Sequence, residues 1–213
     1  MSQSREDEPA CPRLFVDDDQ SSRTGPYARS ARDYAANGWH TLPVLDGGKG
    51  KVPAGFTGYA ARKVTEEDVS RWIDEQGLGD SNVCVRLMYE VGLDIDSYDD
   101  TKKAREAWER LCAEHGEPPP TVRVSARFGE GYDGLAGIRI YRLPRKFWTL
   151  VEQRVWEGQI GSGIDLIRLG HRQVVCWPSV HPKLGTTYQW MDERTGEIHN
   201  GPLPPTDTLP ELF

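Results

Sequence analysis

The sequence has few cysteines, and none of them stands in a paired motif. The four cysteines are scattered along the chain and form no C-x-x-C pair; they are Cys11, Cys84, Cys112 and Cys176. This pattern argues against both a disulfide framework and a structural zinc site. We therefore expect a protein of the reducing cytoplasm that carries no zinc module.

The chain also lacks long apolar runs and any excess of positive charge. No run approaches the roughly 20 apolar residues that a membrane-spanning helix needs. The opening "MSQSREDEPACPR" is polar and acidic, which excludes a secretory signal in these residues. The formal net charge is −7, so binding to nucleic acid would require a local basic groove rather than bulk charge.

Length and composition predict one domain with a tail at each end. The 213 residues suit a single domain of fair size. Residues 1–25 are polar and acidic, and we interpret them as a disordered tail. Residues 26–200 form the expected domain. Residues 201–213, "GPLPPTDTLPELF", predict a proline-rich tail or the start of a linker, so that the protein continues into a helicase or accessory domain.

The order of elements predicts an α+β fold. Helical patterns occur in "GPYARSARDYAANG", in "TEEDVSRWIDEQG" and over about residues 99–115; the second begins with a capping box of Thr65 and Asp68. "NVCVRLMYEVGLDID" predicts one β-hairpin, and "GIDLIRL" with "RQVVCWP" predicts another. Residues 39–45, 121–128 and 138–144 alternate as strands, whereas 148–156 fit a helix or a strand. Helices mixed with mostly antiparallel strands indicate α+β.

Two acids in "VGLDIDSYDD" stand out. Asp94 and Asp96 lie one residue apart on a predicted strand, so both side chains point to one face. Like charges on a rigid face repel each other unless a cation lies between them, and oxygen ligands favour Mg²⁺ or Mn²⁺. The alternative is a strand end whose acids face water. We assign Asp99 and Asp100 to helix capping.

A third acid strengthens the metal interpretation. Asp165 interrupts the apolar strand of "GSGIDLIRL", where a lone carboxylate is costly. It could instead end a hairpin and accept hydrogen bonds from glycine N–H groups. Three acids on two strands are the ligands that two ions need in phosphoryl transfer.

Several blocks in order resemble the bifunctional primase–polymerase domain of the archaeo-eukaryotic primase superfamily. "YAANGWHTLPV", "KGKVP" and "TEEDVSRWID" resemble its first blocks, and "NVCVRLMYEVGLDID" resembles its first acidic motif. The third motif is matched by "GIDLIRLGHRQVVCWPSVHPKLGTTYQW". The resemblance covers about residues 27–191.

The resemblance implies a fold and an activity. Family members pack an N-terminal α/β module on a mostly antiparallel sheet like that of an RNA-recognition motif. They join NTPs or dNTPs to a primer on a DNA template, or start a primer, with Mg²⁺ or Mn²⁺. Carried onto this chain, the metal ligands are Asp94, Asp96 and Asp165.

The resemblance also suggests residues that hold the nucleotide. Arg139 stands where the family's second motif has a histidine that contacts the incoming phosphates, and arginine can hold phosphate bidentately. Arg172 and His181 follow the third motif, where a basic residue reaches the triphosphate. Weaker candidates for the nucleotide site are Ser125, Arg127 and Lys51, and Tyr132 is a weaker candidate for stacking on a base. Each of them could instead occupy an ordinary exposed position on a strand or loop.

Two other functions fit the same acids. A metal-dependent nuclease or phosphodiesterase also uses paired acids and two ions, although it would want a histidine near the acids, and the histidine nearest along the chain to Asp94 and Asp96 is His115. A nucleotide-binding or nucleic-acid-binding module without catalysis is the third possibility, and the arginine at position 139 is its best support.

Overall fold

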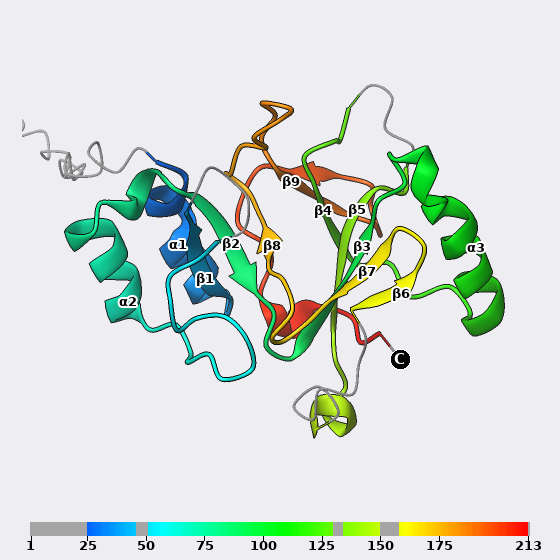
Figure 1. The fold of residues 1–213 in the computed structure, drawn as a ribbon, viewed down its shortest axis with the longest axis horizontal. Helices are drawn as coiled ribbons and strands as arrows, with labels where there is room; N and C mark the ends of the chain where they lie inside the picture. Colours follow the sequence, from blue (N-terminus) through cyan, green and yellow to red (C-terminus); the bar gives the residue numbers. More distant parts are fainter. Residues whose placement is uncertain (1–24, 46–50, 130–133, 150–157, 213) are drawn as a thin grey trace, which may run out of the picture.

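The computed structural model describes residues 25–45, 51–129, 134–149 and 158–212. They form an α+β fold of two antiparallel sheets with helices at both ends of the molecule (Figure 1). This confirms the predicted fold class. The predicted N-terminal tail falls outside the described residues, as do most of residues 148–156. No described helix has the length and apolar character needed to cross a membrane.

The smaller sheet has the order β1-β2-β8, with β1 at His40–Val44, β2 at Asn82–Arg86 and β8 at Val174–Val175. Helix α1 (Pro26–Ala36) begins with proline in its first turn, where the missing N–H costs nothing. Helix α2 (Glu66–Ser70) continues as a π-helical turn, Arg71–Glu75. The capping box of Thr65 and Asp68 is confirmed at its start. Both helices lie beside this sheet, at the left in Figure 1.

The larger sheet has the order β10-β9-β4-β5-β3-β7-β6. Its strands are β3 (Glu90–Ile95), β4 (Val122–Ser125), β5 (Gly137–Arg142), β6 (Gln159–Gly161), β7 (Ile164–Ile167), β9 (Gln189–Asp192) and β10 (Ile198–His199). Helix α3 (Ala104–His115) lies against β6 and β7 and ends at Gly116, whose φ is +86°. Short 3₁₀ turns occur at Leu78–Asp80, Asp100–Lys102, Arg145–Phe147 and Thr206–Thr208.

The strand pairing predicted for both hairpins was wrong, although Arg168 and His171 form a single antiparallel bridge at the second turn. β2 pairs with β1 and β8, whereas β3 pairs with β5 and β7. In the same way β7 belongs to the larger sheet and β8 to the smaller one. The chain therefore crosses between the sheets at residues 87–89 and again at 168–173. The sequence patterns predicted β2, β3, β7 and β8 as strands, but they do not specify the partner of a strand.

One apolar core joins the two sheets. It contains Tyr27 and Tyr34 of α1, Trp72, and Val124 and Ile140 of the larger sheet. Trp39 and Trp72 are buried as expected, and Trp108 of α3 is partly buried against the larger sheet. A second set of buried side chains lies on the opposite face of the larger sheet, between it and α3. One face of the larger sheet thus looks toward the smaller sheet and the other toward α3.

The proline-rich end does not lead away from the domain, contrary to our expectation. Leu203 is fully buried and Leu209 is 3% exposed, both in the core between the sheets. The Nε1 of Trp39 donates to the carbonyl of Pro204 at 2.9 Å, and Asn37 donates to that of Leu203 at 2.7 Å. Residues 201–212 therefore form part of the folded domain.

Candidate functional site

The three predicted acids lie together on the neighbouring strands β3 and β7 of the larger sheet. Asp94 on β3 and Asp165 on β7 are direct partners in the antiparallel register. Directly opposed residues project to the same face. Asp96 follows β3, and its N–H donates to the carbonyl of Gly163 at 2.9 Å, which continues the pairing with the turn before β7. Ile138 of β5 is also a direct partner of Asp94, and it packs against the core between the sheets. The acids therefore lie on the face of the larger sheet that looks toward the smaller sheet.

Arg172 is the cation closest to this pair. Its Nη1 lies 2.6 Å from Oδ2 of Asp165 and 3.7 Å from Oδ2 of Asp94. Burial, and then the negative charge of Asp96, raise the pKa of Asp94 to about 7; the charge of Arg172 opposes them. Burial and the neighbouring carboxylates therefore favour the neutral form of Asp94 more than Arg172 favours its charged form. The structure brings Arg172 to the acids, as the resemblance implied.

Asp96 has partners of its own. The Nζ of Lys102, from the 3₁₀ turn before α3, donates to its Oδ2. Tyr98 is close enough that, after burial, the charge of Asp96 raises the pKa of its hydroxyl. Each of the three carboxylates therefore has a basic side chain within 4 Å.

The donor set suits a hard divalent cation, but its side chains are not gathered for one. Three carboxylates on two adjacent strands offer the oxygen ligands that Mg²⁺ and Mn²⁺ prefer. As placed, however, no group of three or more His, Cys, Asp or Glu side chains in the described part of the chain could hold a metal ion. The acids point to Lys102 and Arg172 instead.

Arg127 and His181 flank the acids. The guanidinium of Arg127 stacks on the ring of Tyr98, 3.8 Å from its centroid. Burial, and then the charge of Arg127, lower the pKa of His181. His181 also shapes its own turn, because its Nδ1 accepts from the N–H groups of Lys183 and Leu184 at 3.2 Å. The ring of His181 lies 5.8 Å from that of Tyr188. Burial raises the pKa of Tyr188 to about 12, and nearby charges, including that of Asp94, contribute less.

Arg139 is not brought to the acids, which corrects our expectation. It is paired with Leu93, one residue from Asp94, and therefore projects from the opposite face. Its Nε donates to Glu193 at 2.9 Å, its Nη1 donates to the carbonyl of Leu135 at 2.9 Å, and its guanidinium lies over Trp108. Arg139 is thus a buried residue between the larger sheet and α3.

Ser125 and Lys51 are also placed elsewhere. Ser125 is 6% exposed, and its hydroxyl accepts from the N–H of Arg127 at 3.1 Å. Strand alternation sets it on the side opposite Val124, which packs toward the smaller sheet. Lys51 forms an isolated bridge with Leu45 just after β1, in the other sheet. Tyr132 lies outside the described residues.

The glycine-rich loop near Lys51 nevertheless borders the site. Arg86 donates to the carbonyls of Gly58, Ala61 and Arg62, which fixes the loop beside the smaller sheet. A small cavity of about 50 Å³ lies between Thr57 and Gly58 of this loop and Gly170 and Arg172. The loop therefore forms part of the surroundings of Arg172.

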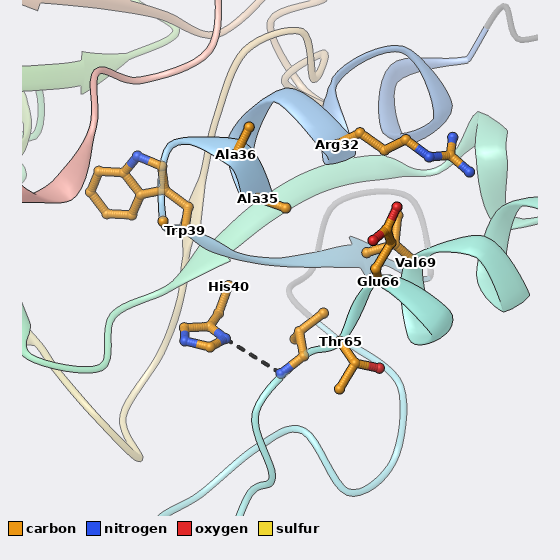
Figure 2. A pocket seen from close by; sticks show the side chains of 10 residues that line it. Arg32, Ala35, Ala36, Trp39, His40, Thr65, Glu66 and Val69 are labelled. Carbon is orange, nitrogen blue, oxygen red and sulfur yellow. Dashed lines mark hydrogen bonds between the residues drawn. The ribbon is translucent and has the colours of Figure 1, made fainter.

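A separate cavity of about 520 Å³ lies on the outer side of α1 and β1. Figure 2 shows its lining, with Trp39 and His40 at one end and Arg32 and Glu66 at the other. The backbone N–H of Val64 donates to His40 Nδ1 at 3.4 Å. Among the described residues, no predicted site residue lines this cavity. It is therefore distinct from the acid cluster.

One family model matches most of the chain. Residues 31–211 match the family model described as bifunctional DNA primase/polymerase, N-terminal. The chain belongs to this Prim-Pol family. No curated protein and no solved structure matches it. Membership in the Prim-Pol family places the chain generally among DNA primases and polymerases, with DNA and nucleotides as its substrates.

Two further residues of the cluster were not predicted from the sequence. Lys102 donates to Asp96, and Tyr98 lies close to the same carboxylate. The helical pattern over about residues 99–115 predicts Lys102 only as part of a helix. The available signal was its position six residues after Asp96 in the same acidic stretch, where the turn before α3 folds the lysine back onto the acid.

Proposed function

We propose that this Prim-Pol domain is a template-dependent nucleotidyltransferase that extends a DNA primer or starts one. The observation that carries the proposal is the direct pairing of Asp94 with Asp165, with Asp96 two residues further along, in a chain that the family model matches. Asp94, Asp96 and Asp165 would hold two Mg²⁺ or Mn²⁺ ions. When bound, such ions neutralise the triphosphate and activate the 3′-hydroxyl.

The chain's own residues would orient the nucleotide. Arg172 is half exposed and already touches two of the acids, so it can turn to the triphosphate when the acids take another cation. Arg127, held against Tyr98, presents a second positive charge beside Asp96. His181 lies near Arg127 on the same side of the site. We assign these three residues to nucleotide binding.

The arrangement of the two sheets also supports a more detailed proposal for the fold, that of the archaeo-eukaryotic primase superfamily. The smaller sheet with α1 and α2 would be the N-terminal α/β module of the superfamily, and the larger antiparallel sheet would be its RRM-like module. The acids lie on the face of the larger sheet that looks toward the smaller one. Template and primer would therefore approach between the two sheets. A helicase or accessory domain remains our proposed partner.

Neither alternative function has a specific observation in its favour. His115, the histidine considered for a nuclease, is at the end of α3 on the far face of the larger sheet and lies beside Glu114. The binding-module hypothesis depended on Arg139, which lies outside the acid cluster.

Primer extension tests the proposed function. A labelled primer on a DNA template, with dNTPs and Mn²⁺ or Mg²⁺, should be elongated by the wild-type protein. Asp94→Asn and Asp165→Asn should each lower the rate by about 10²-fold or more, because each removes a metal ligand. Their thermal midpoints should not fall. Asp99→Asn, a change in the same acidic stretch at a carboxylate that accepts from Thr101, is the matched control and should retain activity.

Three outcomes would contradict the proposal. Shortening of the primer would indicate a nuclease, and nucleotide binding without turnover would indicate a binding module. Full extension by Asp94→Asn or Asp165→Asn would remove the acids from the reaction.

A further inference from the structure

Lys102 is a positive charge placed directly on a proposed metal ligand. Its Nζ donates to Oδ2 of Asp96. The side chain of Lys102 is 41% exposed, whereas that of Asp96 is 17% exposed. The ammonium can therefore leave Asp96 without breaking any core packing.

The backbone around Lys102 is fixed to the strand pair that carries Asp165. The hydroxyl of Ser162 donates to the carbonyl of Lys102. Gly163 lies so close that a Cβ there would meet the Cβ atoms of Ala104 and Lys102 at 2.8 and 2.9 Å. The carbonyl of Gly163 also accepts from the N–H of Asp96. The backbone of the lysine is thus held in place, whereas its side chain is partly exposed.

A divalent cation and the ammonium compete for the same oxygen. Lys102 and Arg172 together neutralise two of the three negative charges of the cluster. A metal ion at Asp96 would displace the ammonium, which would then need another anion within reach. The phosphates of an incoming nucleotide are the anions that the proposed reaction brings to this place.

We propose that Lys102 competes with the divalent cation for Asp96 and, once displaced, binds a phosphate of the incoming nucleotide. The metal frees the ammonium of Lys102 to bind the nucleotide, and the nucleotide holds that ammonium away from Asp96. Each ligand therefore raises the affinity of the site for the other. Lys102 acts here as a positioning residue. The inference rests on the proposed function, because it requires the metal and the nucleotide to meet at this cluster.

Binding of Mn²⁺ tests the inference without any turnover. Free Mn²⁺ is measured by electron paramagnetic resonance during titration of the protein, alone and with a dNTP analogue that has an α,β-imido bridge. Lys102→Met should bind Mn²⁺ about fivefold more tightly than wild type when no nucleotide is present, as expected for the loss of one partly exposed competing charge. The factor by which the analogue raises the Mn²⁺ affinity should be about fivefold larger for wild type than for Lys102→Met.

Lys103→Met is the matched control, because this neighbouring lysine is exposed at the start of α3. Equal Mn²⁺ affinities and equal effects of the analogue in Lys102→Met and Lys103→Met would overturn the inference and leave the proposed function standing. Weaker Mn²⁺ binding by Lys102→Met would also overturn it. Absence of Mn²⁺ binding by wild type under both conditions would overturn the proposed metal site itself. Circular dichroism establishes that each variant is folded, and Lys102→Gln replaces Lys102→Met if the latter is not.

Discussion

At the scale of single residues, strand alternation decides which charged side chains meet. Asp94 and Leu93 are neighbours on β3, and their partners on β5 are Ile138 and Arg139. Asp94 therefore shares a face with Asp165, whereas Arg139 is sent to the face that α3 covers. A shift of one residue along the strand therefore decides whether a side chain joins the acid cluster or the buried ion pair on the opposite face.

Arg139 is expected to stabilise the fold rather than to bind nucleotide. Arg139→Met removes the ion pair between Arg139 and Glu193 and the hydrogen bond to the carbonyl of Leu135, whereas the ion pair of Glu193 with Arg123, at 3.4 Å, remains. Breaking a buried ion pair in this way should lower the free energy of unfolding by about 3 kcal/mol. Urea unfolding measures the loss, and a dNTP titration of the folded variant should give an affinity within about twofold of wild type.

Arg110→Met is a control on the exposed side of α3 and should leave the stability unchanged. A stable Arg139→Met protein with weakened nucleotide binding would return Arg139 to the site.

At the scale of elements, the start of α2 is fixed by one buried carboxylate. Asp68 is nearly inaccessible, and it accepts from the N–H of Thr65 at 3.1 Å and from both terminal nitrogens of Arg62 at 2.7 and 2.6 Å. Arg71 is a further donor. Burial acts to raise the pKa of Asp68, but these hydrogen bonds outweigh it and hold the pKa well below its usual range.

The depressed pKa predicts how stability changes with pH. Because the folded state favours the ionised carboxylate, Asp68 contributes stability above about pH 4, and this contribution is lost as the pH falls below that value. Asp68→Asn should lower the free energy of unfolding by about 2 kcal/mol at pH 7, and the difference should shrink toward pH 2. Urea titrations at several pH values measure it.

Glu67→Gln, an exposed change on the same helix, should show no such dependence. An Asp68→Asn difference that stays constant from pH 7 to pH 2 would show that the charge of Asp68 does not support the helix start.

At the scale of the whole molecule, the last described residues close the core between the two sheets. Leu203 is fully buried, and the segment that carries it contacts the end of α1 through Asn37 and Trp39. Arg142 of β5 makes an ion pair of 3.2 Å with Glu211. The final residues therefore hold parts of both sheets, as Figure 1 shows for the red segment beneath them.

Leu203→Ala should destabilise the domain as a core substitution does. The lost burial and the remaining cavity should lower the free energy of unfolding by about 2–4 kcal/mol. Leu184→Ala, at a leucine that is 40% exposed, should cost less than about 0.5 kcal/mol. Thermal and urea unfolding measure both. Equal, small effects would mean that residues 201–212 pack only loosely on the domain.

Local signals determined the local structure in this protein. The capping box of Thr65 and Asp68, the glycine that ends α3 and the alternation of β3, β4 and β5 could all be predicted, because each depends on residues a few positions apart. The acids could be singled out for the same reason, since carboxylates within apolar strands are costly wherever those strands lie. The order of the family's blocks then indicated the Prim-Pol family.

The tertiary structure alone decided which strands pair and what each side chain faces. Strand patterns contain no information about partners, so β2 and β3 were expected as a hairpin although they lie in different sheets. Register set Asp165 opposite Asp94 and turned Arg139 away. The turn before α3 brought Lys102 to Asp96, a contact that depends on the fold of the turn and on the glycine beside it. Pairing and close approach are long-range properties, and for that reason the sequence supplied the charges while the fold arranged them.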